Sequence, residues 1–476
     1  MRRFLLLVLA AAALLTSCKN TGNGELTGVP NRHKQAFQKI PYGMTYVPMG
    51  SYVMGAGDQD VPYALNHNPK TTSISAFFMD ETEITNNEYR MFVYWVRDSL
   101  AKTILGYRYM DNQDASHFKW DKANGQPKRY GSGDYEYYAI DWDKKIDWGE
   151  EVKEKGNKEL AKNPLEKLFL PMQERYGRER QLDTRLLVYR YWIVDMPAAA
   201  KKINRFVWDS AAIMSKPIQD LEEDRTDQFY GSYRSGIADR SVFVKQFITN
   251  IYPDTLCWMS DFAYSYNEPI AKVYFWHPAY DDYPVVGVNW VQAKAFNAWR
   301  TDYMKSALPK GTAMINEFRL PTEAEWEWAA RGGLELSPYP WGGPYLRNTE
   351  GCLLANFKPM RGDYSCDGSA YSVRVASYQP NNYGLYDMSG NVAEWTEDAY
   401  DGMAYHFTWD MNPGYTYNAG QKDLPVLKRK VVRGGSWKDI GYFLQVSSRS
   451  YEYQDSTNCY TGFRSVQSYL GRQLGR

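Results

Sequence analysis

The chain has 476 residues, of which 44% are hydrophobic and 16% aromatic, including 40 tyrosines and 16 tryptophans. A chain of this length can bury a large core and has room for two or three domains, and its aromatic content excludes a mainly disordered protein. Because 56 basic residues balance 56 acidic ones, no global charge attracts nucleic acid, and we expect no nucleic-acid partner.

The N-terminal segment has the pattern of an export signal. Two arginines precede an apolar run over residues 4–15, which is too short to span a membrane but has the length of a secretory signal. The run ends in Leu-Thr-Ser-Cys, a tetrad that resembles a bacterial lipobox with Cys18 as the lipidated residue. We therefore predict a signal peptide over 1–17 and a lipidated tether over 18–40. The alternative is an ordinary signal peptide in which the cysteine stands by chance.

The next segment, 41–99, predicts two strands and a helix. Turn-forming residues at 48–51 predict a hairpin over 44–55. Thr85 and Glu88 have the spacing of a capping box, which predicts a helix from Asn86 to Asp98. One face of that helix is apolar and should pack inward: Tyr89, Phe92, Val93 and Val96.

Residues 100–280 have a different composition, with dense charge and scattered aromatic residues. The stretches Leu182–Tyr191 and Met196–Trp208 combine apolar and basic faces, and we predict both as helices. This segment either packs on a core of its own or also presents an exposed surface for assembly, since aromatic residues and arginine are enriched at interfaces.

Two further helices are predicted after residue 280. Asn289 with Gln292 caps a helix from Trp290 to about Tyr303, and Thr322 with Glu325 caps one over 323–331. Beyond Gly333 the chain is rich in Gly, Pro, Asn and Asp, so little regular structure is expected there.

The stretches Arg319–Gly333 and Gly384–Trp395 gather carboxylates, amides and large aromatic side chains. In the first, Glu323, Glu325 and Glu327 invite an acid–base interpretation, but helix capping and the helix dipole explain them better. In the second, Asp387, Asn391 and Glu394 supply oxygen atoms that could hold a hard cation or satisfy a buried turn. We expect Arg433 and Arg464 to pair internally with such carboxylates.

Both stretches resemble signature segments of the formylglycine-generating enzyme (sulfatase-modifying factor) domain family. Further motifs keep that family's order: Met79–Asn86, Pro284–Trp290, Pro340–Gly342, Ala355–Phe357, Arg433–Trp437 and Thr461–Arg464. The resemblance implies an α+β, C-type-lectin-related fold with little regular secondary structure. Its two parts would be 41–99 and 281–470, and residues 100–280 would form a large, mainly helical insertion.

The resemblance also implies which chemistry is missing. The family's enzymes oxidise a substrate cysteine with copper held by a cysteine pair shortly after the Arg-Gly-Gly-Ser segment. Here residues 437–449 contain no cysteine, and the nearest is Cys459. Copper(I) requires soft thiolate ligands, and the five histidines are scattered without a metal-binding spacing. We therefore expect no catalytic activity and no copper.

Structural calcium is the cofactor that the resemblance implies. The matching positions are Asn356, the Phe357 carbonyl and Asp367 for one site, and Asn391, the Gly390 or Val392 carbonyl and Glu394 for the other. Oxygen donors of this kind suit Ca²⁺. Asp363 could replace Asp367, because the spacing there departs from the family pattern. The alternative is that these groups satisfy buried turns without a metal.

Four cysteines remain after the predicted signal: Cys257, Cys352, Cys366 and Cys459. An exported location permits a disulfide between Cys352 and Cys366, although four cysteines allow three full pairings. None of the four forms a C-x-x-C pair, which argues against a zinc or redox site.

A degenerate domain of this family with a lipobox and a long insertion resembles the GldK/PorK lipoproteins of the type IX secretion and gliding machinery. That resemblance implies a homo-oligomeric ring with a GldN/PorN-type periplasmic partner. Residues 19–23 lack the acidic run that marks surface export in such lipoproteins, so we expect an outer-membrane anchor facing the periplasm. The alternatives are a sibling GldJ-type lipoprotein, or an exported enzyme or carbohydrate-binding protein that uses the cleft in which the family's enzymes have their active site.

Overall fold

The computed structural model describes residues 38, 40–56, 69–121, 124–130, 137–153, 160–175, 177, 179–208, 231–237, 239–263, 268–308, 315–359, 362–366 and 369–471. The predicted signal peptide, Cys18 and nearly all of the predicted tether therefore lie outside the described residues. Within those ranges, the search for a helix with the length and apolarity of a membrane span found none.

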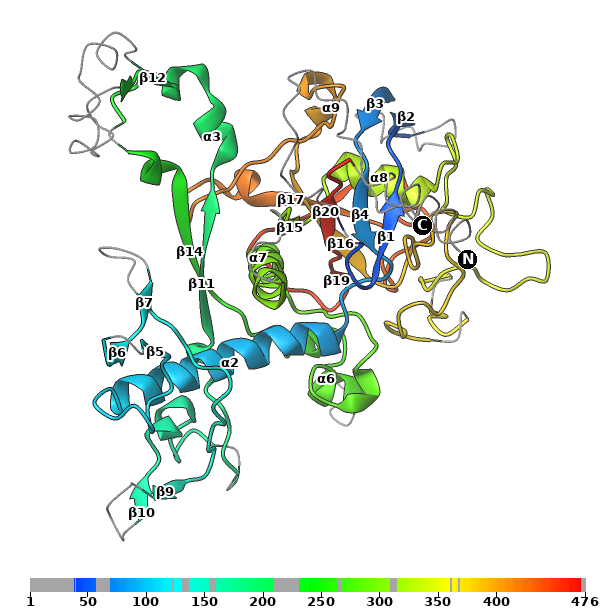
Figure 1. Ribbon diagram of the computed structural model, residues 1–476. Coiled ribbons are helices and arrows are strands. Elements are labelled where there is room, and N and C mark those ends of the chain that lie inside the picture. The colour runs from blue at the N-terminus through cyan, green and yellow to red at the C-terminus, as the bar shows by residue number, and fades with distance from the viewer. Residues whose placement is uncertain are drawn as a thin grey trace, which may run out of the picture.

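Two four-stranded sheets lie in the body of the protein (Figure 1). The first has the order β1 (Met44–Val47), β4 (Phe77–Asp80), β20 (Val466–Ser468), β15 (Phe318–Arg319), with antiparallel neighbours. The second has the order β18 (Ser450–Tyr453), β17 (Arg429–Arg433), β16 (Ala393–Ala399), β19 (Thr461–Gly462), with β16 and β19 parallel. Because β20 pairs with β4, segments from the two ends of the chain share one sheet.

The predicted hairpin over 44–55 is wrong in its pairing. β1 pairs with β4, whereas β2 (Gly50–Met54) pairs with β3 (Lys70–Ile74). At the turn between β1 and β2, the indole N–H of Trp328 donates to the Pro48 carbonyl oxygen at 2.9 Å. A Cβ at Gly50 would lie 2.6 Å from the same ring. A side chain from a distant helix therefore packs against the turn and directs the second strand to another partner.

Three capped helices pack around the sheets: α2 (Asn86–Arg108), α7 (Trp290–Ala307) and α8 (Glu323–Arg331). Each begins with the predicted capping box. α8 ends as predicted at Gly332, which adopts a left-handed conformation with φ 58°. The start and the end of α8 are thus determined by residues at its own termini.

α2 continues well beyond its predicted end at Asp98. Its second half carries Ala101 and Leu105, which are buried against Leu165 and Leu168 of the following segment. This burial stabilises turns that the first apolar stripe does not reach. The predicted inward face of the first half is confirmed, since Tyr89, Phe92, Val93 and Val96 are all buried.

The segment 100–280 is not mainly helical, so that prediction is wrong. Beyond the end of α2 its described strands are β5 (Trp120–Asp121), β6 (Gln126–Pro127), β7 (Arg129–Tyr130), β8 (Tyr137–Tyr138), β9 (Glu151–Lys153), β10 (Leu160–Lys162), β11 (Val188–Val194), β12 (Phe206–Trp208), β13 (Gly231–Tyr233) and β14 (Val244–Asn250). Its described α-helices beyond α2 are short, α3 (Met196–Ala200) and α6 (Pro269–Val273), and described 3₁₀ turns span Pro164–Leu168, Thr184–Leu186, Lys202–Asn204, Arg240–Phe243, Cys257–Ser260 and Pro278–Tyr280. The predicted helix Leu182–Tyr191 is replaced by a 3₁₀ turn and the start of β11, because Val188–Val194 alternates between exposed and buried side chains. The predicted helix Met196–Trp208 forms only in part, as α3, and is followed by a 3₁₀ turn and β12.

Part of this segment projects from the body as an arm. β11 and β14 pair antiparallel along seven residues each and lead to the shorter pair β12–β13 at the far end (Figure 1). We call the β11–β14 pair the ribbon. Tyr189 and Tyr191 on its inner face join the main core cluster with Phe92, Phe296 and Trp395. The root of the arm is therefore packed on α2 and α7.

Candidate functional site

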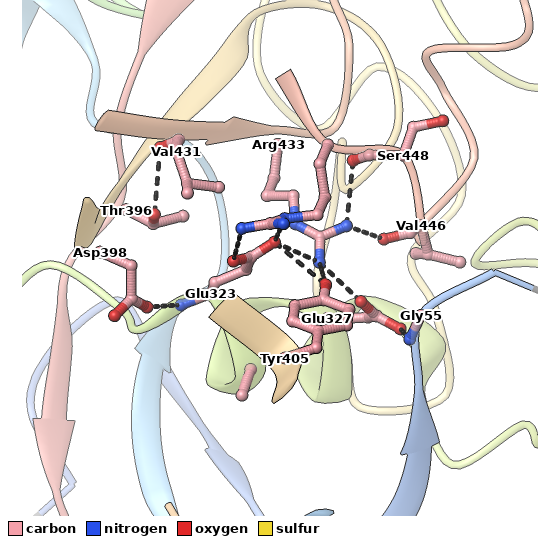
Figure 2. A network of polar contacts seen from close by, with 12 residues as sticks. Gly55, Glu323, Glu327, Thr396, Asp398, Tyr405, Val431, Arg433, Val446 and Ser448 are labelled. Atoms are coloured by element: carbon pink, nitrogen blue, oxygen red, sulfur yellow. Dashed lines mark hydrogen bonds and ion pairs between the residues drawn. The ribbon is translucent and has the colours of Figure 1, made fainter. Parts of the chain in front are cut away.

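Two buried glutamates on α8 face one arginine from β17 (Figure 2). Glu323 and Glu327 lie one helical turn apart, and Arg433 Nη2 is 2.9 Å from Glu323 Oε1 and 2.6 Å from Glu327 Oε2. The Nη1 group of Arg433 donates to the carbonyl oxygens of Val446 and Ser448, both at 2.9 Å. The predicted internal pairing of Arg433 is confirmed. These charges therefore hold α8 against the second sheet.

The predicted capping role holds for Glu325 but not for its two neighbours. Glu325 closes the capping box and binds Arg319 at 2.6 Å. Glu323 instead binds Arg449 and Arg433, and Glu327 binds Arg331 at 2.7 Å and Arg433. Spacing of four places Glu323 and Glu327 on one side of the helix. They are structural counter-ions in the core.

Asp398 completes this network from β16. Its carboxylate accepts backbone N–H groups of Glu323, at 2.5 Å, and Tyr415. Burial raises the pKa of Asp398 to about 7. The group is therefore close to its titration point at neutral pH.

Glu394, a predicted calcium ligand, is engaged by protein donors. Arg464 Nη2 lies 2.6 Å from Glu394 Oε1, and its Nε lies 2.8 Å from Oε2, which also accepts the indole N–H of Trp326 at 2.7 Å. The expected internal pairing of Arg464 is confirmed. Because both carboxylate oxygens already accept strong donors, the residues present do not fit a calcium ion directly at Glu394.

Beside Glu394 lie two carboxylates with spare oxygen atoms. Glu83 Oε1 accepts the Asn391 side-chain amide at 3.1 Å, whereas Glu83 Oε2 and Asp387 Oδ1 are buried and accept no hydrogen bond from the described protein. Burial raises the pKa of Glu83, and the nearby Asp387 raises it further. Burial also raises the pKa of Asp387 to about 6. These orphaned oxygens fit a proton or a hard cation.

Glu83 was not among the predicted ligands, and Asp387 was noted only as an oxygen donor. The available signals were a glutamate inside the Met79–Asn86 motif and, only in the structure, the positive φ of 55° at Asp387. No cluster of three or more His, Cys, Asp or Glu side chains suited to a metal occurs in the described ranges. A cation at this point would therefore need amide and carbonyl oxygens as well, such as those of Asn391 and its neighbours.

The residues of the first predicted calcium site lie directly beside those of the second. The Asn356 carbonyl oxygen accepts the backbone N–H of Asn391 at 2.8 Å, and the Asn356 amide lies 3.4 Å from Asn391 Oδ1. A Cβ at Gly390 would lie 2.4 Å from the Asn356 carbonyl oxygen, so glycine is required there. Phe357 and Val392 are buried beside them. Asp367 lies outside the described residues, Asp363 is exposed, and calcium stays a prediction.

The first residue after Arg-Gly-Gly-Ser, Trp437, packs against the long insertion. Trp437 is stacked on Trp258, with ring centroids 5.8 Å apart and ring planes at 17°. Both belong to a buried cluster with Tyr274, Val392 and Cys459. The Trp437 indole donates to the Cys459 carbonyl oxygen at 3.2 Å. The first residue of this segment, Trp437, is therefore buried by aromatic packing from the insertion.

The four described cysteines are all free thiols. Cys352 and Cys366 are both exposed and unbonded, so the proposed pairing between them stays a prediction. Burial raises the pKa of Cys257 and of Cys459, and the Cys459 thiol donates to Asp261 Oδ2 at 3.0 Å. Neither buried thiol is prepared to act as a nucleophile or a soft metal ligand.

A larger cleft of about 770 Å³ lies between the arm and α7. Its lining includes Ile193, Asp195, Lys245 and Phe247 from the arm, Lys294, Asn297, Thr301 and Lys305 from α7, and Arg319, Glu397 and Tyr417 from the body. Lys294 is paired with Glu397 at 2.6 Å inside it. Because the lining carries both signs of charge, it favours no single charged ligand.

Comparison with known proteins identifies the family of the chain. The family described as "Sulfatase-modifying factor enzyme 1-like domain" matches residues 30–256 and 274–469. The Bos taurus "Inactive C-alpha-formylglycine-generating enzyme 2" is 34% identical over 200 residues, 41% of this chain and 53% of that protein. The Bos taurus "Formylglycine-generating enzyme" is 31% identical over 197 residues, 40% of this chain and 45% of that protein.

The chain thus spans about half the length of these relatives, which include one protein named inactive and one named as an enzyme. Among solved structures, PvdO from Pseudomonas aeruginosa has a TM-score of 0.42 at 14% identity, covering 92% of this chain and 100% of that one. A TM-score at this level carries no argument about function.

Proposed function

Since the chain belongs to the sulfatase-modifying factor enzyme 1-like domain family yet stacks a tryptophan of its insertion on the residue that follows Arg-Gly-Gly-Ser, we propose that it is a non-catalytic scaffold. In this proposal the protein is a lipid-anchored lipoprotein of the GldK/PorK type. It forms a periplasmic ring of the type IX secretion and gliding machinery together with a GldN/PorN-type protein.

The stacking of Trp258 on Trp437 carries the non-catalytic part of the proposal. A catalyst needs room for substrate beside its reacting groups, and here the insertion places Trp258, which is 1% exposed, against the first residue of the segment. Residues 437–449 also contain no cysteine. The relatives named inactive, from Bos taurus and Mus musculus, are consistent with loss of activity within the family.

Loss of copper chemistry follows from the same residues. Cys459 is the nearest cysteine to the segment, and burial raises the pKa of its thiol. Copper(I) binds thiolates rather than buried thiols. Residues 437–449 therefore offer no thiolate ligand for copper(I).

The location and partner in this proposal rest on the sequence. The lipobox ending at Cys18 supports an acyl anchor, and the absence of acidic residues at 19–23 supports a periplasmic orientation in the outer membrane. The projecting arm gives the body a surface that a compact enzyme would not need. A GldJ-type sibling shares the domain and the anchor, and a different partner in the purified complex would distinguish it.

The test combines assembly, export and chemistry. The full chain, extracted in detergent and sized, should elute as a very large particle that contains a second protein, and deletion of its gene should abolish protein export. The purified chain should neither bind copper(I) tightly nor convert a peptide cysteine to an aldehyde. A monomer that performs that conversion would overturn the proposal.

Structural calcium is a second part of the proposal. Glu83 and Asp387 each have a buried oxygen without a protein donor, and Asn391 adjoins them through its bond to Glu83. A divalent cation would neutralise this carboxylate pair and fix the Gly384–Trp395 stretch. It supplies charge only, and no reaction step depends on it.

A further inference from the structure

The ribbon has an apolar face directed away from the core. In a two-stranded sheet packed on one side, the outer side chains are normally polar. Here the inner face carries Tyr189, Tyr191 and Phe247, which pack in the main core cluster. The outer face instead presents a set of large apolar side chains that are each 38–58% exposed: Val188, Trp192, Val194, Val244 and Ile248.

One cation stands in the middle of this face. Arg190 is exposed and lies directly opposite Ile248 in the strand register. Trp192, two residues along, is on the same side of the strand. Apolar side chains around a tryptophan and an arginine have the composition of a binding hot spot. We call this set, with Arg190, the ribbon face.

A second exposed apolar set lies on the body at α9 (Ala404–Phe407). It consists of Met403, Phe407, Trp409 and Met411, exposed by 56%, 53%, 85% and 66%, and we call it the α9 patch. An almost fully exposed tryptophan is costly to leave in water. This set is not a loose loop, because its backbone is bonded to β3: Ser73 N–H donates to the Asp410 carbonyl oxygen at 2.8 Å, and Asn412 N–H to the Ser73 carbonyl oxygen at 2.8 Å.

The α9 patch carries the opposite charge to the ribbon face. The Asp410 side chain, between Trp409 and Met411, is 85% exposed, and its partner Lys70 at 3.2 Å is only 14% exposed. The carboxylate is therefore the group that faces outward. The strands β11 and β14 lie apart from α9 in Figure 1, so the two surfaces do not cover each other within one chain.

We propose that the ribbon face of one chain binds the α9 patch of a second copy, with Arg190 directed at Asp410. This inference rests on the proposed ring, because a closed ring with one kind of subunit requires two different, complementary surfaces on each chain. The two surfaces are complementary in apolar character and opposite in charge. Each copy would use both surfaces, one for each neighbour.

Other occupants fit the residues less well. Two ribbon faces packed symmetrically would bring Arg190 near its own equivalent, with like charges across the interface. An anionic membrane would attract a strongly basic arm, but residues 188–250 carry nine basic and eight acidic residues. The acidic α9 patch is also unsuited to an anionic surface.

The decisive experiment mixes two variants of the full chain, each purified in detergent. Arg190→Glu damages only the ribbon face and Trp409→Ala only the α9 patch. Each variant alone should self-associate about 30-fold more weakly than the unmodified chain, the loss expected for a hot-spot residue. An equimolar mixture should form discrete heterodimers by sedimentation, because one intact ribbon face then meets one intact α9 patch.

Matched controls distinguish a loss of association from a loss of folding. Lys119→Glu reverses an exposed charge outside both surfaces, and Tyr345→Ala removes a ring that is 75% exposed. Both should assemble like the unmodified chain, and all four variants should melt at the same temperature. Combining Arg190→Glu with Asp410→Arg should restore association, which a change in folding alone would not do.

A cross-link gives the geometry. In a chain with Cys352→Ser and Cys366→Ser, the pair Ile248→Cys and Met411→Cys should form intermolecular disulfides in native membranes, whereas either substitution alone should form few. Ribbon-to-ribbon contact would instead link Ile248→Cys with itself and would overturn the proposal.

The outcomes separate this inference from the proposed function. Self-association that is insensitive to both variants would overturn the ribbon–patch contact and leave the scaffold proposal standing. An unmodified chain that stays monomeric at high concentration would overturn both. If Arg190→Glu reduced only binding to phosphatidylglycerol vesicles, the ribbon face would be a lipid surface and the inference would be wrong.

Discussion

Trp258 of the long insertion stacks on Trp437, the last residue of the Arg-Gly-Gly-Ser-Trp motif, with the rings at 17° and 5.8 Å. The two residues are far apart in sequence, and their contact joins the root of the insertion to the segment where the family's enzymes are expected to hold copper. The insertion is therefore part of the core of this protein and not an independent appendage.

Replacing Trp258 by alanine should both destabilise the protein and open this cluster. Removal of a buried tryptophan ring costs about 3–5 kcal/mol of unfolding free energy, which denaturant titration measures. The Cys459 thiol, buried in the same cluster, should then react faster with a thiol reagent. Trp409→Ala, at a residue that is 85% exposed, serves as the control and should leave the monomer's stability unchanged. Equal stability for both variants would contradict the packing described here.

Breaking the buried ion network on α8 should be costly. Glu327→Gln leaves Arg331 and part of the Arg433 charge without a partner, and loss of one member of a buried pair costs about 3–5 kcal/mol. A joint Glu327→Gln and Arg433→Met variant should lose less than the sum of the two single changes, because both members of the Glu327–Arg433 ion pair are then removed together. Additive losses in chemical denaturation would show that the two side chains do not interact.

Calcium should raise the melting temperature at neutral pH if the Glu83–Asp387 pair binds it. Saturation at about one hundred times the dissociation constant adds about 2.7 kcal/mol, and a chelator should reverse the gain. Asp387→Asn should abolish the response to calcium while raising stability in chelator, since it removes a buried charge that burial disfavours. A calcium response that survives in Asp387→Asn would place the cation elsewhere.

Deprotonation of Asp398 should lower the free energy of unfolding as the pH rises from about 4 to 7. Its folded pKa of about 7 lies above the value of an unfolded aspartate. The folded state therefore binds the proton of Asp398 more tightly than the unfolded state does. This proton binding contributes fully to the free energy of unfolding below the unfolded pKa, and the contribution is lost as the pH rises through the folded pKa. The stability difference between the unmodified chain and Asp398→Asn, measured by denaturation at several pH values, should change across this window. A difference that is independent of pH would contradict the assignment.

The sequence by itself determined the features that depend on neighbouring residues. The capping boxes at Thr85, Asn289 and Thr322 were all predicted, because a cap is a contact between residues three positions apart. The inward face of α2 and the left-handed end of α8 at Gly332 follow from equally local rules. The missing cysteines over 437–449 were also visible without any structure.

Only the tertiary structure decided which strands pair and which carboxylates are engaged. β2 pairs with β3, and a tryptophan from α8 packs against the turn before β2. Residues 44–55 by themselves do not predict that contact. Glu394 looked like a metal ligand in its motif, but Arg464, 70 residues later, occupies its oxygens. Glu83 gained its importance only when folding buried its Oε2 atom without a hydrogen-bond donor. The strand partners and the hydrogen-bond partners of these carboxylates are set by long-range packing. The residues involved are far apart in sequence, so local spacing does not predict which of them meet.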